Sequence, residues 1–256
     1  MNTHMNNPTR VQLGPVALDS LTMPEALERL HAFTSDGRTH YVCFCEASIL
    51  SNVERDPELA AALARADLCV ADGIAAIWLG RIHRHAFPER IQGPRFMLEA
   101  CRESVARGYS HYFYGGTPDT LAALTANLSG QFPGLKIAGT RSPPFRDLTP
   151  GEEAAERAVI EAAKPDLVWV ALGSPRQEKW AARQAAVINA PVLLAVGAAF
   201  DFHAGSRPWA PRWVRATGME WLFRMATGGR RTLRRNARCV PVVAGLLIRE
   251  FCRKRR

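Results

Sequence analysis

The sequence predicts an α/β fold built on a mostly parallel sheet with helices on both faces. Short runs rich in β-branched and aromatic residues alternate with longer amphipathic stretches along the chain. Such alternation is typical of strand–helix–strand units, which place parallel strands side by side under covering helices. The chain has 256 residues and 47% hydrophobic residues, which is sufficient for one large domain with a substantial core.

The predicted elements follow in chain order. Two short runs, Val11–Leu13 and Val16–Leu18, flank Gly14-Pro15 and predict a hairpin. Pro24, followed by Leu27, Leu30 and His31 at helical spacing, indicates the first helix. Six further strands are predicted at Tyr41–Cys45, Leu68–Ala71, His111–Tyr114, Lys136–Gly139, Leu167–Leu172 and Val192–Val196. Helical patterns cover residues 47–66, 74–86, 94–107, 118–131, 152–163 and 176–188.

Charge divides the chain into two parts. Residues 206–256 hold 14 Lys and Arg but only two acidic residues, whereas the rest holds 19 basic and 22 acidic residues. We therefore expect a core of residues 1–225 and a basic, partly apolar appendage of residues 226–256. Such asymmetry indicates an anionic partner, either a membrane surface or a nucleic acid.

The candidate binding residues follow the predicted strands. In open α/β sheets, ligands bind beyond the carboxyl ends of the strands. Four predicted strands are followed there by small or polar residues: Asp72 and Gly73; Gly115 and Gly116; Gly173, Ser174, Gln177 and Glu178; and Gly197, Phe200 and Asp201.

The chemistry of these loops suits a diphosphate and an acceptor hydroxyl. Glycine lets the backbone approach a ligand, and the helix start that follows presents free N–H groups to an anion. Asp72 can act as a general base, while Gln177 can bind a base edge or a sugar hydroxyl. Arg90 can pair with phosphate. Each residue also has a structural interpretation: plain β–α turns for the glycines, a turn or cap for Asp72, a dipole-complementing position for Glu178 and a solvated surface position for Arg90.

No metal or cofactor is expected. Asp201 and His203 form one DxH pair, and a usable metal site needs three or four ligands. The six cysteines form no CxxC pair, so they are expected to pack as small hydrophobic residues.

The C-terminal segment combines arginines with an apolar run. Val240, Ala244, Leu247 and Phe251 recur at helical spacing, although Pro241 limits where a helix can begin. This pattern favours an interfacial helix on anionic lipid over nucleic-acid binding. A second copy of the chain is an alternative cover for the apolar run, so a homo-oligomer stays open. The polar N-terminus and the absence of a run of about 20 apolar residues predict a cytoplasmic protein without a membrane span.

Seven segments together carry a resemblance that covers about residues 40–225. They are RDPELAAALARADLCVADG, PERIQG, YFYGGTPDT, FPGLKIAGT, KPDLVWVALGSPRQEKW, AVGAAFDFHAG and GMEWLFRM. In this order they resemble the WecG/TagA/CpsF family of bacterial glycosyltransferases.

The resemblance implies an inverting transferase with a Rossmann-like core that moves a sugar from a UDP-sugar to an undecaprenyl-diphosphate-linked acceptor. It implies Asp72 as the catalytic base, the glycine-rich loops and Gln177 in the donor cleft, and no metal. The basic appendage would bind the inner face of the cell membrane and complete the site, with Arg224, Arg230, Arg231, Arg234 and Arg235 as the expected contacts.

Three departures from the family pattern lie near the expected donor or acceptor. They are Glu46 in Phe44-Cys45-Glu46, Gly93 in Gly93-Pro94-Arg95, and Trp209 in Trp209-Ala210-Pro211. They leave the transferred sugar open between a hexose and an N-acetylhexosamine. Two other functions compete: a non-catalytic nucleotide- or nucleic-acid-binding protein with a basic arm, and a dinucleotide-dependent oxidoreductase, which would lack its GxGxxG fingerprint.

Overall fold

The computed structural model describes residues 9–85, 87–211, 213–214 and 217–255 and confirms the α/β architecture. Its eight strands form one sheet in the order β1-β2-β4-β3-β8-β7-β5-β6. The strands are β1 (Thr9–Leu13), β2 (Val16–Ser20), β3 (His40–Cys45), β4 (Leu68–Ala71), β5 (Ser110–Gly115), β6 (Lys136–Arg141), β7 (Leu167–Ala171) and β8 (Val192–Ala195). Only the β1–β2 hairpin is antiparallel, so the carboxyl ends of β2 to β8 meet at one edge, here called the carboxyl edge.

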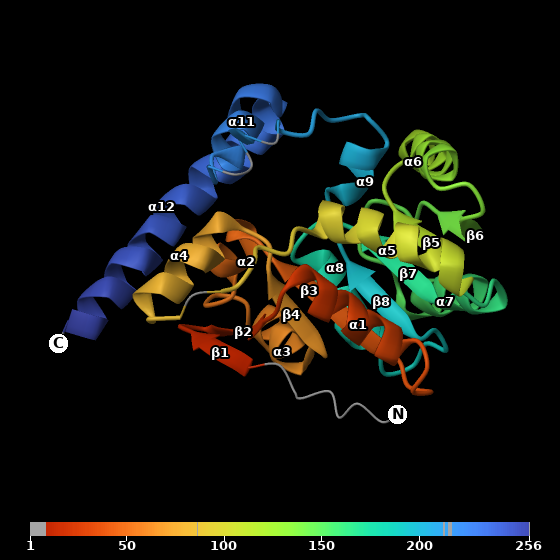
Figure 1. The fold of residues 1–256 in the computed structure, drawn as a ribbon, viewed down its shortest axis with the longest axis horizontal. Coiled ribbons are helices and arrows are strands. Elements are labelled where there is room, and N and C mark those ends of the chain that lie inside the picture. Colours follow the sequence, from red (N-terminus) through yellow and green to blue (C-terminus); the bar gives the residue numbers. More distant parts are fainter. Residues whose placement is uncertain (1–8, 86, 212, 215–216, 256) are drawn as a thin grey trace.

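Helices cover both faces of the sheet (Figure 1). One face carries α1 (Met23–Phe33), α5 (Gly93–Arg107), α6 (Pro118–Gln131) and the short α9 (Ala199–His203). The other carries α2 (Ala47–Asn52), α3 (Pro57–Arg65), α4 (Ile74–Ile82), α7 (Pro150–Ala162) and α8 (Arg176–Gln184). Two helices follow at the C-terminus, α11 (Glu220–Thr227) and α12 (Gly229–Arg255).

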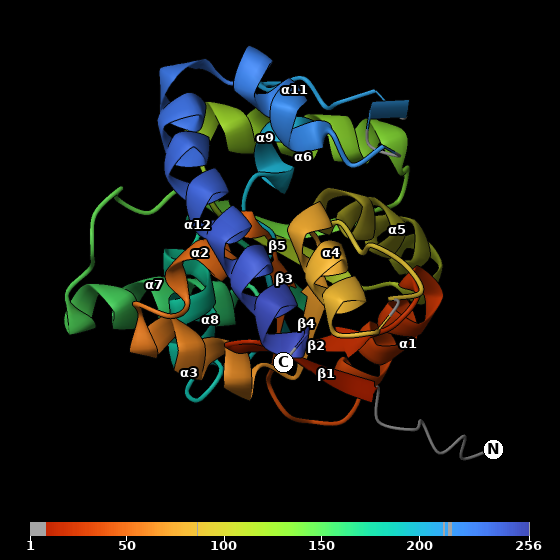
Figure 2. The same ribbon diagram turned by 90° about the vertical axis from the view of Figure 1, so that its left-hand side faces the viewer.

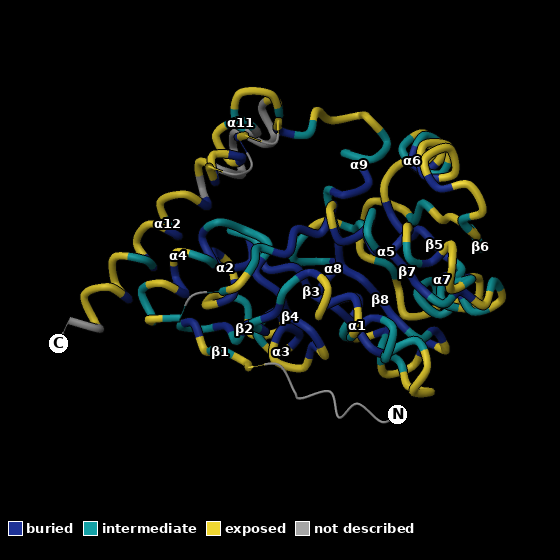
Figure 3. The backbone as a smooth tube through the Cα atoms, in the orientation of Figure 1, coloured by how far each residue is buried: buried dark blue, intermediate teal, exposed yellow. Residues whose placement is uncertain are grey.

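The strands explain the core because successive side chains point to opposite faces. In β3, Cys43 and Cys45 pack on the α8 side, whereas Val42 and Phe44 pack on the α5 side. The central strands are therefore buried on both faces, as Figure 3 shows in dark blue. Five of the six cysteines are buried, and Cys252 is exposed.

One predicted helix proves to be two. The pattern over residues 47–66 was expected to be continuous, but the chain breaks between α2 and α3. Asp56 has an extended φ of −129°, and its carboxylate accepts a hydrogen bond from the backbone N–H of Leu59 at 3.0 Å. Pro57 follows in the first turn, and a residue before proline is disfavoured in helical conformation. The Asp-Pro pair therefore starts a new helix.

The C-terminal helix differs from the expectation at Pro241. Helix α12 runs from Gly229 to Arg255, so Pro241 lies in its interior and does not set its beginning. Proline has no N–H, so the carbonyl of Ala237, four residues earlier, lacks its helical hydrogen-bond donor. Ala237 and Pro241 are both exposed, so water can donate to that carbonyl instead. The helix persists because Cys239, Val243, Leu246 and Glu250 on its inner side are buried.

Helix α12 lies alongside α2 and α4 at one end of the sheet, as Figures 1 and 2 show. Val243 and Leu246 join the core cluster on the α8 side of the sheet. Arg249 pairs with Glu54, and His83 at the end of α4 approaches Glu250 at 3.2 Å. Within the described part of the chain, no helix combines the length and apolar character that a membrane crossing requires.

Candidate active site

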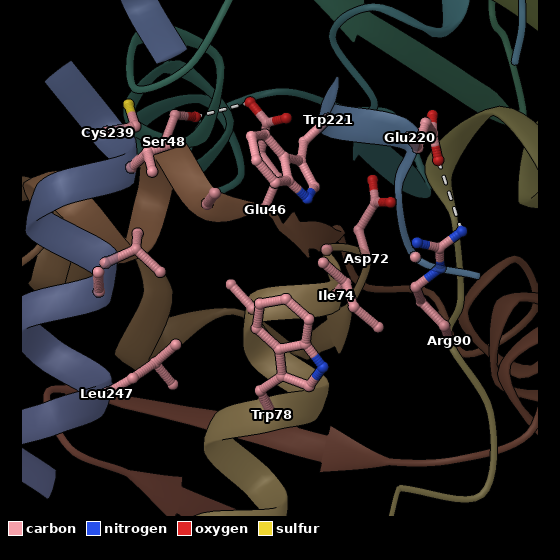
Figure 4. A pocket seen from close by; sticks show the side chains of 17 residues that line it. Glu46, Ser48, Asp72, Ile74, Trp78, Arg90, Glu220, Trp221, Cys239 and Leu247 are labelled. Carbon is pink, nitrogen blue, oxygen red and sulfur yellow. Dashed lines mark hydrogen bonds and ion pairs between the residues drawn. The ribbon is translucent and has the colours of Figure 1, made fainter. Parts of the chain in front are cut away.

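A cavity of about 190 Å³ opens at the carboxyl edge, where β3 and β4 end (Figure 4). One wall comes from the sheet loops and carries Glu46, Asp72 and Arg90. The facing walls come from α4, α11 and α12 and are mostly apolar. Their larger side chains are Ile74, Trp78, Trp221, Val240, Val243 and Leu247. The cavity therefore joins a charged side to an apolar side.

Asp72 stands at the end of β4, where backbone bonds fix the turn. The N–H groups of Asp72 and Gly73 both donate to the Cys45 carbonyl, at 3.2 and 3.1 Å. Gly73 also lies so close to β3 that a Cβ there would be 3.3 Å from the Cα of Glu46. The backbone N–H of Gly93 donates to the Asp72 carboxylate at 3.3 Å. The partly exposed carboxylate is thus held at the cavity wall, as a general base requires.

Arg90 is held by a residue 130 positions away in the sequence. Its guanidinium donates to Glu220 at 3.5 Å, and the Gln92 amide donates to the same carboxylate oxygen at 2.7 Å. Glu220 opens α11 and is 6% exposed. Residues 89–92 reach this place because the N–H of Ile91 donates to the Ala71 carbonyl at the end of β4, at 3.0 Å. The structure thus places Arg90 beside the cavity and not on an open surface.

Glu46 brings a second carboxylate to the same cavity. It lies at the end of β3, directly before α2, and its side chain accepts a hydrogen bond from the Ser48 hydroxyl at 2.6 Å. Figure 4 shows Glu46 and Asp72 on the same side of the cavity, with Leu247 of α12 across from them. The two carboxylates can therefore contact the same bound molecule.

Gln177 connects the carboxyl ends of β7 and β8. Its carbonyl oxygen accepts from the N–H of Gly173 after β7, at 3.2 Å. Its amide nitrogen donates to the Ala195 carbonyl in β8 and to Glu178, at 3.1 and 2.9 Å. Gly197 packs against this amide, since a Cβ there would be 3.1 Å from the Gln177 oxygen. Gln177 and Glu178 are buried, which makes them internal braces of the carboxyl edge.

The loop after β5 lies against β7 and α9. Gly115 has φ +118°, and a Cβ there would be 2.3 Å from the Ala171 carbonyl oxygen, so only glycine fits. Gly116 is exposed and packs against the Phe200 ring. Phe200 itself is 1% exposed and contacts Phe113 edge-on, which makes it a core residue beneath the loop.

The DxH pair has partners within the protein. Asp201 forms an ion pair with Arg207 at 3.1 Å, and His203 hydrogen-bonds the Pro94 carbonyl at 2.8 Å. Among the residues that the structure describes, no three His, Cys, Asp or Glu side chains come together as a metal site.

A match to a known family decides the identity. The sequence pattern of "Glycosyl transferase WecG/TagA/CpsF family" matches residues 11–256. The chain belongs to this family. It is therefore a glycosyltransferase, and the resemblance of the seven segments is confirmed.

Two curated relatives carry the same enzyme name, "N-acetylglucosaminyldiphosphoundecaprenol N-acetyl-beta-D-mannosaminyltransferase". The protein from Bacillus subtilis (strain 168) is 26% identical, with 79% of this chain and 80% of the relative covered. The protein from Staphylococcus aureus (strain NCTC 8325) is 23% identical, with 86% and 85% covered.

The predicted site residues of this glycosyltransferase fall into three groups. Glu46, Asp72, Gly73 and Arg90 line the cavity, and Gly93 contacts Asp72 from outside its lining. Gly115, Gly116, Gly173, Ser174, Gln177, Glu178, Gly197, Phe200 and Asp201 lie along or beside the same carboxyl edge, outside the lining of this cavity. The side chains of Arg224, Arg230, Arg231, Arg234 and Arg235 lie outside the described residues.

Sequence reasoning missed the helical walls of the cavity. Glu220 and Trp221 belong to GMEWLFRM, one of the segments that carry the family resemblance, yet nothing local links them to Arg90. Three residues of the predicted lipid-facing stripe, Val240, Ala244 and Leu247, also line the cavity. Only Phe251 of that stripe, 46% exposed, lies outside it. The acidic Glu220 within a basic segment is the one signal that could have pointed to the site.

Proposed function

We propose that this glycosyltransferase moves a hexose or an N-acetylhexosamine from a UDP-sugar to an undecaprenyl-diphosphate-linked saccharide, with inversion at the anomeric carbon. N-acetylmannosamine is the first donor sugar to test, since both relatives are named for its transfer. The observation that carries the proposal is the division of the cavity. Glu46, Asp72 and Arg90 occupy its sheet side, while its helical side is apolar apart from Glu220.

Asp72 serves as the general base in this proposal. Its carboxylate removes the proton of the acceptor hydroxyl, whose oxygen then attacks the anomeric carbon and displaces UDP. The Gly93 N–H donates to one carboxylate oxygen and so helps to fix the base at the cavity wall. Backbone N–H groups of the glycine loops and Arg90 stabilise the departing diphosphate.

The apolar wall suits the polyprenyl end of the acceptor. Trp78, Trp221 and Val240 are 42%, 39% and 42% exposed, so the apolar lining continues to the surface. An isoprenoid chain that leaves the cavity along these side chains removes them from water, which is favourable. The sugar end of the same acceptor then lies toward Asp72.

Substitution of Asp72 tests the base. We expect Asp72→Asn to lower kcat at least about a hundredfold while the Kd for UDP changes little, because the amide keeps the shape but cannot take a proton. Exposed Asp147→Asn is the matched control and should retain wild-type turnover. Near-normal kcat in Asp72→Asn would remove the base assignment, and a chain that binds no UDP would refute the donor assignment.

We further propose that residues 226–256 act as a basic appendage that binds the anionic inner face of the cell membrane. Its cations contribute about 1 kcal/mol each at such a surface. Replacing Arg230 and Arg231 with Gln should therefore weaken binding to phosphatidylglycerol vesicles by roughly thirtyfold. The matched control is replacement of exposed Arg102 and Arg107 on α5 with Gln. Equal losses in both variants would refute the proposal, and salt-sensitive binding to DNA without vesicle binding would favour a nucleic-acid partner.

A further inference from the structure

Glu178 is a completely buried carboxyl group in the first turn of α8. Its side chain is 0% exposed, and no Lys, Arg or His pairs with it among the described residues. A glutamate that only complements a helix dipole lies in solvent. An acidic side chain sealed inside the protein without a cation is costly when ionised. This burial therefore requires a different explanation.

The surroundings of Glu178 disfavour its charge. The buried, uncharged thiols of Cys43, Cys45 and Cys69 belong to the core cluster on the α8 side of the sheet. The carboxylate of Glu46 is the charged group that acts on Glu178. Burial raises the pKa of Glu178 to about 7, and the negative charge of Glu46 acts in the same direction. The hydrogen bond that the Gln177 amide donates acts in the opposite direction, as do the backbone N–H of Glu178 and the nearby Ser174 hydroxyl.

The direct contact of Glu178 is the Gln177 amide, which joins two glycine turns. One amide orientation satisfies all three partners: the nitrogen donates to Glu178 and Ala195, and the oxygen accepts from Gly173. The reverse orientation would set the amide oxygen against the Ala195 carbonyl and the amide N–H against that of Gly173. The acceptor oxygen of Glu178 thus helps to fix an orientation on which both turns depend.

We propose that Glu178 is a positioning residue that acts through the Gln177 amide and holds the Gly173 and Gly197 turns ready for the donor only while its carboxyl group carries a proton. The inference rests on the proposed function, because it takes these turns as part of the donor site. When the proton leaves, the carboxylate could still accept from the Gln177 amide, but its uncompensated buried charge draws in water or moves the side chain away. That displacement takes the acceptor oxygen from the amide. The turns at the ends of β7 and β8 then loosen together.

The test is calorimetric titration with UDP from pH 6 to 9 in three proteins: wild type, Glu178→Gln and Glu28→Gln. Glutamine has the shape of a protonated glutamic acid but cannot ionise, and Glu28 is an exposed glutamate on α1. We expect the three proteins to bind alike at pH 6. At pH 9, wild type and Glu28→Gln should bind UDP more weakly than Glu178→Gln, by on the order of tenfold to a hundredfold.

Each other outcome overturns a defined statement. Parallel pH profiles in all three proteins would refute the proton dependence of Glu178. A loss of UDP affinity in Glu178→Gln already at pH 6 would show that the site needs the carboxylate itself, and would also overturn the inference. Wild-type protein that binds no UDP at any of these pH values would instead refute the proposed donor, and the inference with it.

Discussion

Docking of α12 onto the core can be tested at a single side chain. Leu246 is 5% exposed and belongs to the core cluster, whereas Ile248, two residues later, is 64% exposed. Leu246→Ala removes three buried carbon groups, worth about 0.8 kcal/mol each on transfer, and leaves a cavity. We therefore expect a loss of about 3 kcal/mol in the free energy of unfolding. Ile248→Ala shortens a similar side chain that already lies in water, so it should change the free energy of unfolding by less than about 0.5 kcal/mol.

Two measurements check the position of α12. Urea denaturation gives the free energy of unfolding, and tryptic cleavage at the arginines of α12 reports how often the helix leaves the core. Leu246→Ala should accelerate that cleavage, and Ile248→Ala should not. The helix also carries Val240 and Leu247 of the cavity, so Leu246→Ala should raise the acceptor KM more than the UDP Kd. Equal effects of the two substitutions in both measurements would refute the docked position of α12.

Three further predictions address other parts of the molecule. Gly115→Ala should destabilise the protein by several kcal/mol in urea denaturation, because of its positive φ and the nearby Ala171 carbonyl, whereas Gly130→Ala, with open space in helix α6, should be neutral or stabilising. Glu220→Ala should raise the donor KM severalfold in steady-state kinetics, because Arg90 loses its buried anchor. The pKa of Glu178 is raised from 4.5 to about 7 in the folded protein. The wild-type free energy of unfolding should therefore fall by about 3 kcal/mol relative to Glu178→Gln as the pH rises from about 4.5 to above 7.

Most of the fold could be predicted because the central strands are buried on both faces. Runs such as Leu68–Ala71 and Val192–Ala195 are short, apolar and bounded by turns, so their pattern alone marks them as strands. The errors arose where two local signals competed. Helical spacing continued across Pro57, yet the proline and the Asp56 cap divided the helix. At Pro241 the outcome was the reverse, because burial of Val243 and Leu246 outweighed one lost hydrogen bond.

The polar half of the site could also be predicted, since strand ends of a parallel sheet converge at one edge. Asp72 and Glu46 follow neighbouring strands, and their meeting depends only on the strand order β4-β3. The apolar half could not be predicted. Val240 and Leu247 face the cavity because of the angle at which α12 packs on α2 and α4, and a sequence period does not specify that angle. Phe200 was expected to bind substrate because it lies in a loop after a strand end, but its side chain is 1% exposed and belongs to the core.

The arrangement of the two halves has a chemical consequence. A lipid-linked saccharide is itself divided into an apolar chain and a polar sugar diphosphate, and the cavity offers an apolar wall and a charged wall to match. Asp72 lies on the charged wall, fixed by Gly93, while the apolar wall comes from α4, α11 and α12. An acceptor without its polyprenyl chain would still contact the charged wall, which holds Asp72. It would lose its contacts with the apolar wall, which orient the acceptor. In the proposed reaction, burial of apolar surface along α12 positions the attacking hydroxyl, and the sheet edge positions the base and the leaving diphosphate.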